Sequence, residues 1–338
     1  MTETDLSANE SPFAPSAAVI NAISRELSGL NRYPAREDHL PEALATYHGR
    51  GLTANNFFAA ASGSEVLELI ARAHLGAEDE AVISSPTFPV YARTAQLQRA
   101  RIVDAPLDAA TFALDQGRIL TAITERTRLL YLCNPGNPTG VSVPAVSCVS
   151  LLDALPAHVT VVLDEVYYHF ASRNDFPDAI GFVLEGRPVI VVHTFSKVYG
   201  LAGLRLGYGI AAPAAVERVA RFKREYHHNR LAEVAGIAAL GDGDYVRGTV
   251  AAVAKGRRHL YGELSRLGVP FWESDANFVL IRPPGAPGAV NAALLRQRVR
   301  VRPTEGNGLP GHLRVTVGTE SDNARFIAAL KVAVAECR

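Results

Sequence analysis

Short apolar runs alternate with stretches of helical periodicity over the first two thirds of the chain. The apolar runs lie at residues 81–84, 129–133, 159–163, 189–193 and 207–211, and helical stretches fall between them, including 64–75 and 146–155. Strands that are buried on both faces of a parallel sheet have this nearly continuous apolar character. The pattern therefore predicts an α/β fold, with a large, mainly parallel sheet covered by helices.

The pattern changes near residue 212. A long helical region follows at 214–267, with glycines at 241 and 243, and then come two apolar runs at 277–281 and 313–317 and a last helix from about 321. This order is typical of a smaller α+β lobe. We therefore expect an N-terminal arm at residues 1–34 that forms part of the small lobe, a large domain at 35–212 and a small C-terminal domain at 213–338.

Composition and charge exclude several classes of protein. The 338 residues include 34 basic and 34 acidic side chains, and hydrophobic residues make up 48%, so the chain is neither disordered nor attracted overall to nucleic acid or an anionic membrane. No apolar run approaches the ~18 residues of a membrane span, and the first ten residues lack the apolar core of a signal peptide. The three cysteines are widely spaced, as is typical of a reducing compartment. We expect a cytoplasmic protein with no nucleic-acid or membrane partner.

Only four lysines occur in the chain, so a mechanism that needs a lysine has few candidates. Lys223, Lys255 and Lys331 lie in charged helical surroundings that are typical of a solvated surface. Lys197 differs because it follows the run 189–193 directly, at the end of a strand where open α/β sheets bind ligands. Loss of hydration there would lower the pKa of the amine and make it a usable nucleophile. A lysine that only extends from a strand end to water would leave the same pattern.

Two segments have the composition of a phosphate site. Ser62-Gly-Ser-Glu65 directly precedes an amphipathic helix, so we expect Ser64 as the N-cap and Gly63 as a point where an anion can approach free amides. A helix cap without a ligand has the same sequence. The second segment offers two hydroxyls and a guanidinium near the lysine, at Thr194, Ser196 and Arg205. The sequence lacks the glycine-rich motifs of nucleoside-triphosphate and dinucleotide sites.

Polar groups also follow two other apolar runs. Asn137 lies in Cys133-Asn-Pro-Gly-Asn-Pro-Thr-Gly140, whose prolines and glycines fix an irregular loop, and its amide is a candidate donor unless the loop is only a rigid turn. Asp164 begins Asp164-Glu-Val-Tyr167 at the end of the run 159–163. A carboxylate in that position requires a charged partner or a donor, unless it caps the next helix.

Taken together, Asn-Pro-Gly-Asn-Pro-Thr-Gly, then Asp-Glu-Val-Tyr, then Ser-Lys with an arginine eight residues on, resemble the class I and II aminotransferases. Within that family the chain is most similar to the histidinol-phosphate aminotransferase branch. The resemblance implies the aspartate aminotransferase fold, which is fold type I of the pyridoxal-phosphate enzymes, with pyridoxal 5'-phosphate as cofactor. Further matching pieces cover nearly the whole chain: Ala8-Asn-Glu-Ser-Pro-Phe13, Asn31-Arg-Tyr-Pro34, Ser85-Pro-Thr-Phe-Pro-Val-Tyr91, Ala202-Gly-Leu-Arg-Leu-Gly207 and Gly308-Leu-Pro-Gly-His-Leu-Arg-Val-Thr-Val-Gly318.

The resemblance also implies roles around the cofactor. Lys197 would form the Schiff base and move the proton at the substrate Cα, and Asp164 would keep the pyridine nitrogen protonated so that the ring withdraws electrons. Asn137 and Tyr167 would hydrogen-bond the phenolic oxygen of the ring, and Phe88 would stack on its face. The phosphate would be held by Gly63, Ser64, Thr194, Ser196 and Arg205.

At the substrate end, the resemblance implies that Arg314 holds the α-carboxylate, with Arg302 as a second anion-binding residue and Asn9 as a further substrate contact. Tyr33 would arrive from the neighbouring subunit of a homodimer. The reaction would move an amino group between an amino acid or amino phosphate and a 2-oxo acid. The expected catalytic residues are Lys197, Asp164 and Tyr167, and no metal is expected.

Two features depart from the branch. The segment with Pro-Tyr and a following glycine that usually closes over the substrate is not expected here, because the chain starts shortly before Ala8. The branch commonly has Pro-Tyr-Asn-Val-Asn where this chain has Glu225-Tyr-His-His-Asn229. His227 and His228 fit either a substrate contact or a substitution in a loop, and no carboxylate or cysteine lies at ligand spacing to make a metal site. Both departures weaken the case for histidinol phosphate as the substrate and leave the cofactor site unchanged.

Two other functions remain open. A decarboxylase of amino-acid phosphates, of the threonine-phosphate type, shares the Arg-Tyr-Pro and Gly-Leu-Arg-Leu-Gly-Tyr elements and the cofactor. It differs from a transaminase in which Cα bond lies perpendicular to the ring. A regulator with the same fold would add a DNA-binding region, for which this chain has neither the length nor the basic charge.

Overall fold

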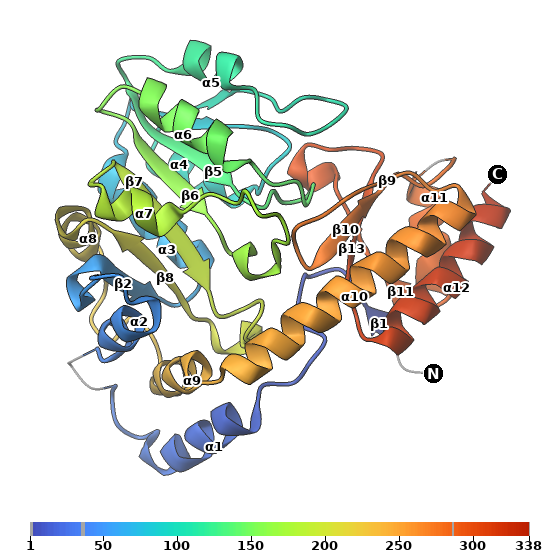
Figure 1. The fold of residues 1–338 in the computed structure, drawn as a ribbon, viewed down its shortest axis with the longest axis horizontal. Coiled ribbons are helices and arrows are strands. Elements are labelled where there is room, and N and C mark those ends of the chain that lie inside the picture. Colours follow the sequence, from blue (N-terminus) through green and yellow to red (C-terminus); the bar gives the residue numbers. More distant parts are fainter. Residues whose placement is uncertain (1–2, 35–37, 286, 338) are drawn as a thin grey trace.

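The computed structural model describes residues 3–34, 38–285 and 287–337. Figure 1 shows a large lobe built on a twisted sheet with helices on both faces, and a smaller lobe joined to it by the long helix α10 (Gly243–Leu267). The division into an arm, a large domain and a small domain stays a prediction. Its limits at residues 1, 35 and 338 lie outside the described residues.

The large sheet has seven strands in the order β2-β8-β7-β6-β5-β3-β4. The five strands from β7 to β4 are mutually parallel, whereas β8 runs antiparallel to β7 and β2 antiparallel to β8. This confirms the expected large, mainly parallel sheet. The strands are β2 (Phe57–Ala60), β3 (Glu80–Ile83), β4 (Arg101–Asp104), β5 (Thr127–Cys133), β6 (Thr160–Asp164), β7 (Val189–Thr194) and β8 (Gly207–Ala211).

Two of these strands were not predicted from the sequence. The strand β4 reads Arg-Ile-Val-Asp and lies at the sheet edge, where its side chains are half-buried or exposed, so it lacks a buried apolar run. The strand β2 reads Phe-Phe-Ala-Ala and is fully buried, but it has only four residues, and two of them favour helices. The five predicted strands are all present, and no end is shifted by more than two residues.

Helices cover both faces of the large sheet and extend to the N-terminal region. They are α1 (Ala17–Glu26), α2 (Leu40–His48), α3 (Gly63–His74), α4 (Val90–Leu97), α5 (Gln116–Ala122), α6 (Ala145–Ala154) and α7 (Ala179–Leu184), with short 3₁₀ turns at Leu27–Gly29, Ala54–Asn56, Tyr168–Phe170, Ala202–Leu204 and Glu305–Asn307. The predicted helical region at 214–267 consists of three helices, α8 (Pro213–Ala220), α9 (Arg230–Leu240) and α10. The segment 221–229, which holds His227 and His228, interrupts it.

The small lobe contains an antiparallel sheet in the order β12-β13-β10-β9 and a parallel pair, β1 with β11. Because β1 lies at the N-terminus and β11 near residue 300, the first residues of the chain belong structurally to this lobe. Its elements are β1 (Thr4–Asp5), β9 (Phe271–Trp272), β10 (Phe278–Ile281), β11 (Val299–Arg300), β12 (Arg302–Pro303) and β13 (Leu313–Thr316), with α11 (Pro287–Arg296) and α12 (Glu320–Glu336). Among the described residues, no helix combines the length and apolar character that a membrane crossing requires.

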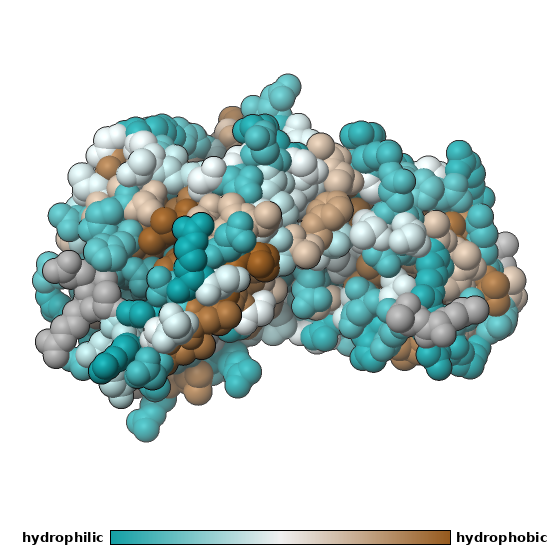
Figure 2. Space-filling model, turned by 90° about the horizontal axis from the view of Figure 1, so that it is seen from below, coloured by the Kyte–Doolittle hydropathy of each residue, from teal (hydrophilic) through white to brown (hydrophobic). Residues whose placement is uncertain are grey.

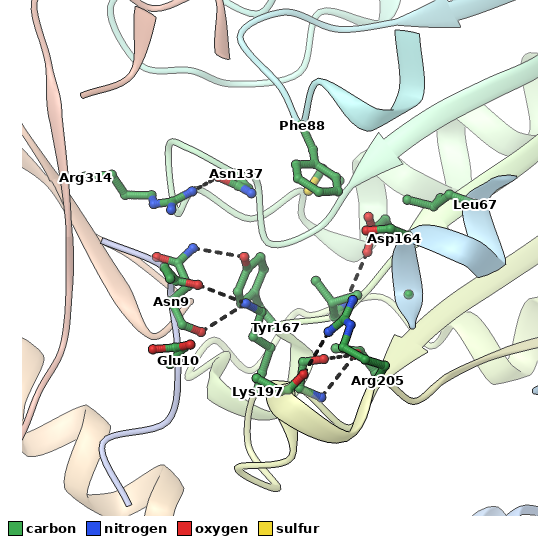
Figure 3. Close-up of a pocket in the computed structure, with 18 of the residues that line it drawn as sticks. Asn9, Glu10, Leu67, Phe88, Asn137, Asp164, Tyr167, Lys197, Arg205 and Arg314 are labelled. Atoms are coloured by element: carbon green, nitrogen blue, oxygen red, sulfur yellow. Dashed lines mark hydrogen bonds between the residues drawn. The ribbon is translucent and has the colours of Figure 1, made fainter. Parts of the chain in front are cut away.

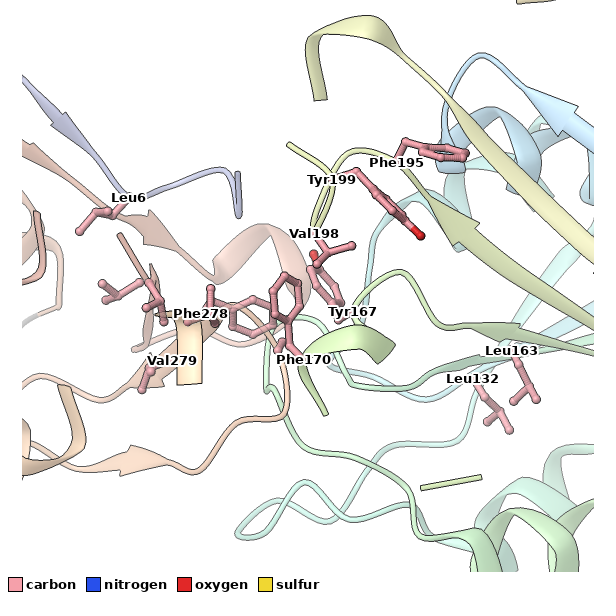
Figure 4. Close-up of a cluster of buried hydrophobic side chains, with 14 of the residues drawn as sticks. Leu6, Leu132, Leu163, Tyr167, Phe170, Phe195, Val198, Tyr199, Phe278 and Val279 are labelled. Atoms are coloured by element: carbon pink, nitrogen blue, oxygen red, sulfur yellow. The ribbon is translucent and has the colours of Figure 1, made fainter. Parts of the chain in front are cut away.

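One hydrophobic core continues from the large lobe into the small one. Figure 4 shows Phe278 of β10 beside Tyr167 and Phe170, which follow β6. The rings of Tyr167 and Phe278 meet edge to face, with centroids 5.2 Å apart. Burial at this junction holds the carboxyl ends of the large sheet against β10 and β13, and the cavity described next lies between them.

Candidate active site

A cavity of about 400 Å³ lies between the carboxyl ends of the large sheet, the N-terminal segment and β13, and is lined by side chains of all three (Figure 3). Its size is ordinary for a small-molecule site. All the proposed site residues except two line it: Asn9, Gly63, Ser64, Phe88, Asn137, Asp164, Tyr167, Thr194, Ser196, Lys197, Arg205 and Arg314. The exceptions are Tyr33 and Arg302.

Lys197 lies in the loop after β7, with its amine turned toward the N-terminal segment. The Nζ donates to the backbone carbonyl oxygen of Asn9 at 3.0 Å and lies 3.4 Å from that of Ala8. Burial lowers the pKa of the amine to about 8, with a smaller contribution from the nearby Arg314 guanidinium, while Glu10 acts in the opposite direction. The amine is therefore available as a neutral nucleophile closer to neutral pH than an ordinary lysine.

Asp164 ends β6 at the floor of the cavity. Its Oδ2 accepts a hydrogen bond of 2.6 Å from the hydroxyl of Tyr91, and its Oδ1 accepts one of 3.3 Å from the amide of Val166. Burial raises the pKa of the carboxyl to about 6, and the two hydrogen bonds limit that rise. Asp164 is thus a buried carboxylate in the middle of the cavity that can hold the proton of a basic ring nitrogen.

Tyr91 is a functional residue that was not predicted from the sequence. It lies in α4 and its ring stacks on Tyr131 with centroids 4.8 Å apart, so an apolar helical pattern correctly marks it as a core residue. The hydroxyl, however, reaches a carboxylate at the end of a different strand. A buried tyrosine needs a partner for its hydroxyl, and that requirement was the only available signal.

The residues expected to hold a phosphate come from the start of α3, the end of β7 and the segment before β8, and they meet in the cavity. Helix α3 begins at Gly63, and Ser62, not Ser64, is its N-cap, since the Ser62 hydroxyl accepts from the amide of Glu65 at 3.1 Å. The expected cap at Ser64 was therefore wrong, and the Ser64 side chain stays at the cavity wall. The Thr194 hydroxyl lies 3.0 Å from that of Ser196.

Backbone geometry brings Arg205 and the start of α3 together. Arg205 has a left-handed conformation with φ of 57°, and its Nη1 donates to the carbonyl oxygen of Ala202 at 2.9 Å. A Cβ atom at Gly207 would lie 2.4 Å from the amide nitrogen of Gly63, so only glycine permits this close approach of β8 to α3. Helix amides, two hydroxyls and a guanidinium are a suitable set for a phosphate dianion.

Arg314 of β13 lies at the opposite end of the cavity and is buried. Its Nη1 donates to Asn137 Oδ1 at 2.6 Å and its Nη2 to the carbonyl oxygen of Ser7 at 2.8 Å, while its Nε is buried and has no partner among the described residues. An unmatched donor on a buried guanidinium indicates a site for an anion. Because Asn137 accepts through Oδ1, its amide NH₂ remains a donor for the cavity.

Asn9 and Tyr167 join the N-terminal segment to the end of β6. The Asn9 side chain donates to the hydroxyl of Tyr167 at 3.0 Å, and its backbone amide donates to Thr316 of β13 at 2.9 Å. Figure 3 shows Asn9, Tyr167 and Lys197 side by side on one wall of the cavity. The neighbouring residues Ala8 and Glu10 also line it and were not predicted as site residues.

Arg302 and Tyr33 lie away from the cavity among the described residues. Arg302 is exposed and stands directly opposite Arg314 in the pairing of β12 with β13, and its charge contributes to lowering the pKa of Arg314, an effect that is mainly due to burial. Tyr33 is 75% exposed and its ring stacks on Tyr226 with centroids 4.5 Å apart. A single chain therefore does not test the expected role of Tyr33 in a partner's site.

The residues present fit pyridoxal 5'-phosphate. The buried carboxylate of Asp164 lies between a phosphate-type cradle at one end and the unmatched Arg314 donor at the other, and Lys197 provides the amine. Phe88 lines the same cavity with its ring edge to face with Tyr91, at a centroid distance of 5.8 Å. An aromatic wall, a ring-nitrogen partner, an amine and a phosphate site are the groups that this cofactor requires.

Comparison with known proteins decides the family. The model of the aminotransferase class I and II family matches residues 2–330. The chain belongs to that family. The histidinol-phosphate aminotransferase 2 of Ralstonia nicotianae is 39% identical over 336 residues, which cover 98% of this chain and 88% of the relative. The histidinol-phosphate aminotransferase of Symbiobacterium thermophilum is 38% identical over 333 residues, which cover 98% of this chain and 90% of that relative.

Solved structures agree with this assignment. The histidinol-phosphate aminotransferase of Sinorhizobium meliloti in complex with pyridoxal-5'-phosphate superposes with a TM-score of 0.90 at 26% identity and covers 100% of this chain and 92% of its own. A double mutant of the Thermus thermophilus aspartate aminotransferase gives a TM-score of 0.88 at 26% identity, and the match covers 98% of this chain and 92% of that one. The predicted resemblance, the fold type, the transaminase class and the cofactor are confirmed with the family. The alternative decarboxylase is not favoured by these relatives.

Proposed function

We propose that this aminotransferase takes an amino donor with an anionic group, of the histidinol-phosphate type, and transfers its amino group to a 2-oxo acid. The observation that supports the proposal is the unmatched, buried Arg314 donor, which shares one cavity with the Lys197 amine and the Asp164 carboxylate. An anion on Arg314 would place the rest of a small donor beside the amine. The names of the relatives support the amino phosphate as substrate class.

We assign the site residues as follows. Pyridoxal 5'-phosphate, when bound, supplies an aldehyde for the amino group and a ring that withdraws electrons from the substrate Cα. Lys197 would hold the cofactor covalently, and its Nζ, once freed by the incoming amino group, would take up and return the Cα proton, since its lowered pKa leaves the amine neutral closer to neutral pH. Asp164 keeps the ring nitrogen protonated. Asn137 and Tyr167 orient the ring through its phenolic oxygen.

The two ends of the cavity position the ligands. Gly63, Ser64, Thr194, Ser196 and Arg205 hold the cofactor phosphate, and Phe88 covers one face of the ring. Arg314 binds the anionic group of the donor, and Asn137 fixes the plane of its guanidinium through the bond of 2.6 Å. Arg302 lies on the exposed side of Arg314 and would meet a second anionic group on larger substrates. Asn9 holds the Tyr167 hydroxyl and borders the substrate space.

We also propose that the protein is a cytoplasmic homodimer in which Tyr33 enters the site of the partner. Figure 2 shows hydrophobic surface gathered on the large-lobe side of the face seen from below. Exposed apolar side chains of the N-terminal region and of the segment before α9 include Ile20, Leu27, Leu30, Tyr33, Phe222 and Tyr226. Exposed apolar surface of this extent is typical of an interface between subunits.

Borohydride reduction of the holoenzyme followed by peptide mapping tests the attachment site. We expect the label on Lys197 and loss of turnover in Lys197→Ala, because the described surroundings of Lys223, Lys255 and Lys331 include carboxylate partners and no cofactor cradle. A label on one of those three lysines would contradict the assignment.

Mixing inactive Lys197→Ala with inactive Tyr33→Ala should restore part of the activity in heterodimers. A fully active monomer in sedimentation would exclude shared sites.

A screen of donors tests the substrate class. Amino phosphates and amino acids are added to the holoenzyme, and the conversion of the cofactor to its pyridoxamine form is followed by absorbance. We expect an amino phosphate to give a kcat/KM at least tenfold higher than alanine, because a phosphate carries nearly two negative charges near neutral pH and the carboxylate of alanine carries one. Equal values would contradict the proposed substrate class without affecting the family assignment.

A further inference from the structure

His227 and His228 are brought together with a carboxylate from far along the chain. The Nε2 of His227 lies 3.8 Å from Asp38 Oδ2, and the Nε2 of His228 lies 3.7 Å from Asp38 Oδ1. One ligand atom from each of these three residues can be chosen so that all lie within 4.8 Å of one another. Positions near the histidines in the sequence offer no carboxylate at ligand spacing, whereas Asp38, which precedes α2, comes close to them only in the folded chain.

A second carboxylate adds a fourth group to the cluster. Glu233, in the first turn of α9, has its Oε2 3.7 Å from the same His228 Nε2. Its other oxygen, Oε1, accepts from the backbone amide of His39 at 3.0 Å, which fixes the carboxylate in place. His228 is only 5% exposed, and its Nε2 therefore lies between two carboxylate oxygens, both beyond hydrogen-bond distance.

An unmatched atom points to a missing ligand. The Oδ2 of Asp38 is shielded from solvent and has no hydrogen-bond partner among the described residues. A buried carboxylate oxygen is costly unless a donor or a cation compensates it. The ammonium of Lys223 lies 3.8 Å away, beyond hydrogen-bond distance, so it compensates the charge only in part.

We propose that Asp38, His227 and His228 form a binding site for a divalent transition-metal ion such as zinc, with Glu233 as the fourth ligand. Two imidazoles and one or two carboxylates are a ligand set that zinc accepts in tetrahedral geometry. Ligands of one such ion, each about 2.0–2.1 Å from it, lie about 3.3 Å apart, whereas the ligand atoms of Asp38, His227 and His228 lie within 4.8 Å of one another, so binding draws them together by up to about 1.5 Å. Binding also requires the His227 ring to give up its contact of 2.7 Å with His228 Nδ1.

The site would join two segments that carry aromatic groups of the proposed dimer interface. Asp38 lies a few residues after Tyr33, and His227 directly follows Tyr226, on which the Tyr33 ring stacks. An ion on Asp38 and the histidines would therefore join the start of α2 to the segment that follows Tyr226. The site lies outside the cavity of the catalytic lysine and does not depend on the proposed substrate.

Zinc titration of the untagged, chelator-treated holoenzyme by calorimetry tests the proposal. We expect about one ion per chain with a dissociation constant that is micromolar or tighter. The variant with His227→Asn and His228→Val, residues of the type found in the related branch, should bind at least tenfold more weakly. Asp38→Asn should do the same while keeping the shape of the side chain. The control His259→Asn, at an exposed histidine, should bind as the unchanged protein does.

Lys223→Met gives a test of opposite sign. Removing the competing ammonium should tighten zinc binding, whereas a protein without this site would show no change. Cofactor absorbance, recorded in every titration, checks that each variant is folded and that zinc does not act on the cofactor. Absence of zinc binding, or binding that survives both Asp38→Asn and the double histidine variant, would overturn the proposal and leave the cluster as a set of hydrogen-bonding groups.

Discussion

The pH dependence of cofactor capture by the apoenzyme is the most direct consequence of the surroundings of Lys197. Only the neutral amine attacks an aldehyde, so the capture rate follows the neutral fraction of Lys197. Burial and the Arg314 guanidinium lower the pKa of this amine from 10.5 to about 8. Because a lowered pKa keeps the amine neutral at lower pH, the rate should rise with pH below 8 and level off above it.

The size of the rise with pH distinguishes an amine of lowered pKa from an ordinary lysine. With a pKa of about 8, the neutral fraction rises only about 1.3-fold between pH 8.5 and pH 10.5, from roughly three quarters to nearly all of the amine. An ordinary lysine would rise about 50-fold over the same interval, from about 1% to about one half. At pH 7 the lowered pKa makes the neutral amine about 300 times more abundant than at an ordinary lysine.

The assay is stopped-flow absorbance after mixing apoenzyme with pyridoxal phosphate at a series of pH values. The same reaction with a free lysine derivative, after division by the neutral fraction of its own amine, corrects for the titration of pyridoxal phosphate itself. A corrected rate that still climbs steeply between pH 8.5 and pH 10.5 would refute the reasoning, because it would show an amine with an ordinary pKa.

Two variants should move the curve in opposite directions. Arg314→Met removes a neighbouring positive charge, which raises the pKa of Lys197 and moves the levelling to higher pH. Glu10→Gln removes a carboxylate that favours the ammonium, which lowers that pKa and moves the levelling to lower pH. Shifts of the same sign, or none, would show that these charges do not act on the amine.

Four further substitutions test the other residues of the site. Asp164→Asn should retain the cofactor absorbance but lower kcat about a hundredfold or more, because an amide cannot hold the ring proton; unchanged Cα-proton removal would give Asp164 another role. Tyr91→Phe removes the hydrogen bond of 2.6 Å that lowers the pKa of Asp164, so that pKa should rise above about 6 and the acid limb of the kcat/KM profile should move to higher pH; an unmoved limb would contradict this. Arg314→Lys should lower kcat/KM for anionic donors about 10- to 150-fold, the loss of one charge-assisted hydrogen bond of about 1.5–3 kcal/mol, with cofactor absorbance unchanged. Arg302→Ala should reduce kcat/KM only for donors with a second anionic group, and equal losses for alanine and glutamate would show that it does not bind that group.

The sequence was most informative where a polar residue ends an apolar run. Lys197, Asp164 and Asn137 each follow a strand of the parallel sheet, and the carboxyl ends of parallel strands meet at one edge, so their proximity could be predicted. The same holds for the hydroxyls beside Lys197, because Thr194 ends β7 and Ser196 directly precedes Lys197. All of these residues line one cavity, although their chemical roles stay predictions.

Other features depend on contacts between segments that are distant in the sequence. The ring of Tyr91 in α4 does pack in the core, as its apolar surroundings in the sequence indicate, and only the fold shows that its hydroxyl reaches Asp164. From the sequence either Ser62 or Ser64 could cap α3, and only the structure shows that the helix begins at Gly63 with Ser62 as its cap. Asp38 and the two histidines show no common periodicity, so their meeting required the packing of α2 against α9.

The N-terminal segment contacts the reacting groups through its backbone. The carbonyl oxygens of Ala8 and Asn9 face the Lys197 amine, and that of Ser7 accepts from Arg314. A substitution cannot remove a backbone carbonyl, so the side chains at Ser7 and Ala8 are free to vary over evolutionary time without loss of these contacts. The deletion of a single residue between Leu6 and Asn9 would displace all three carbonyls at once. This stretch of chain therefore combines tolerance of substitution with intolerance of a change in length.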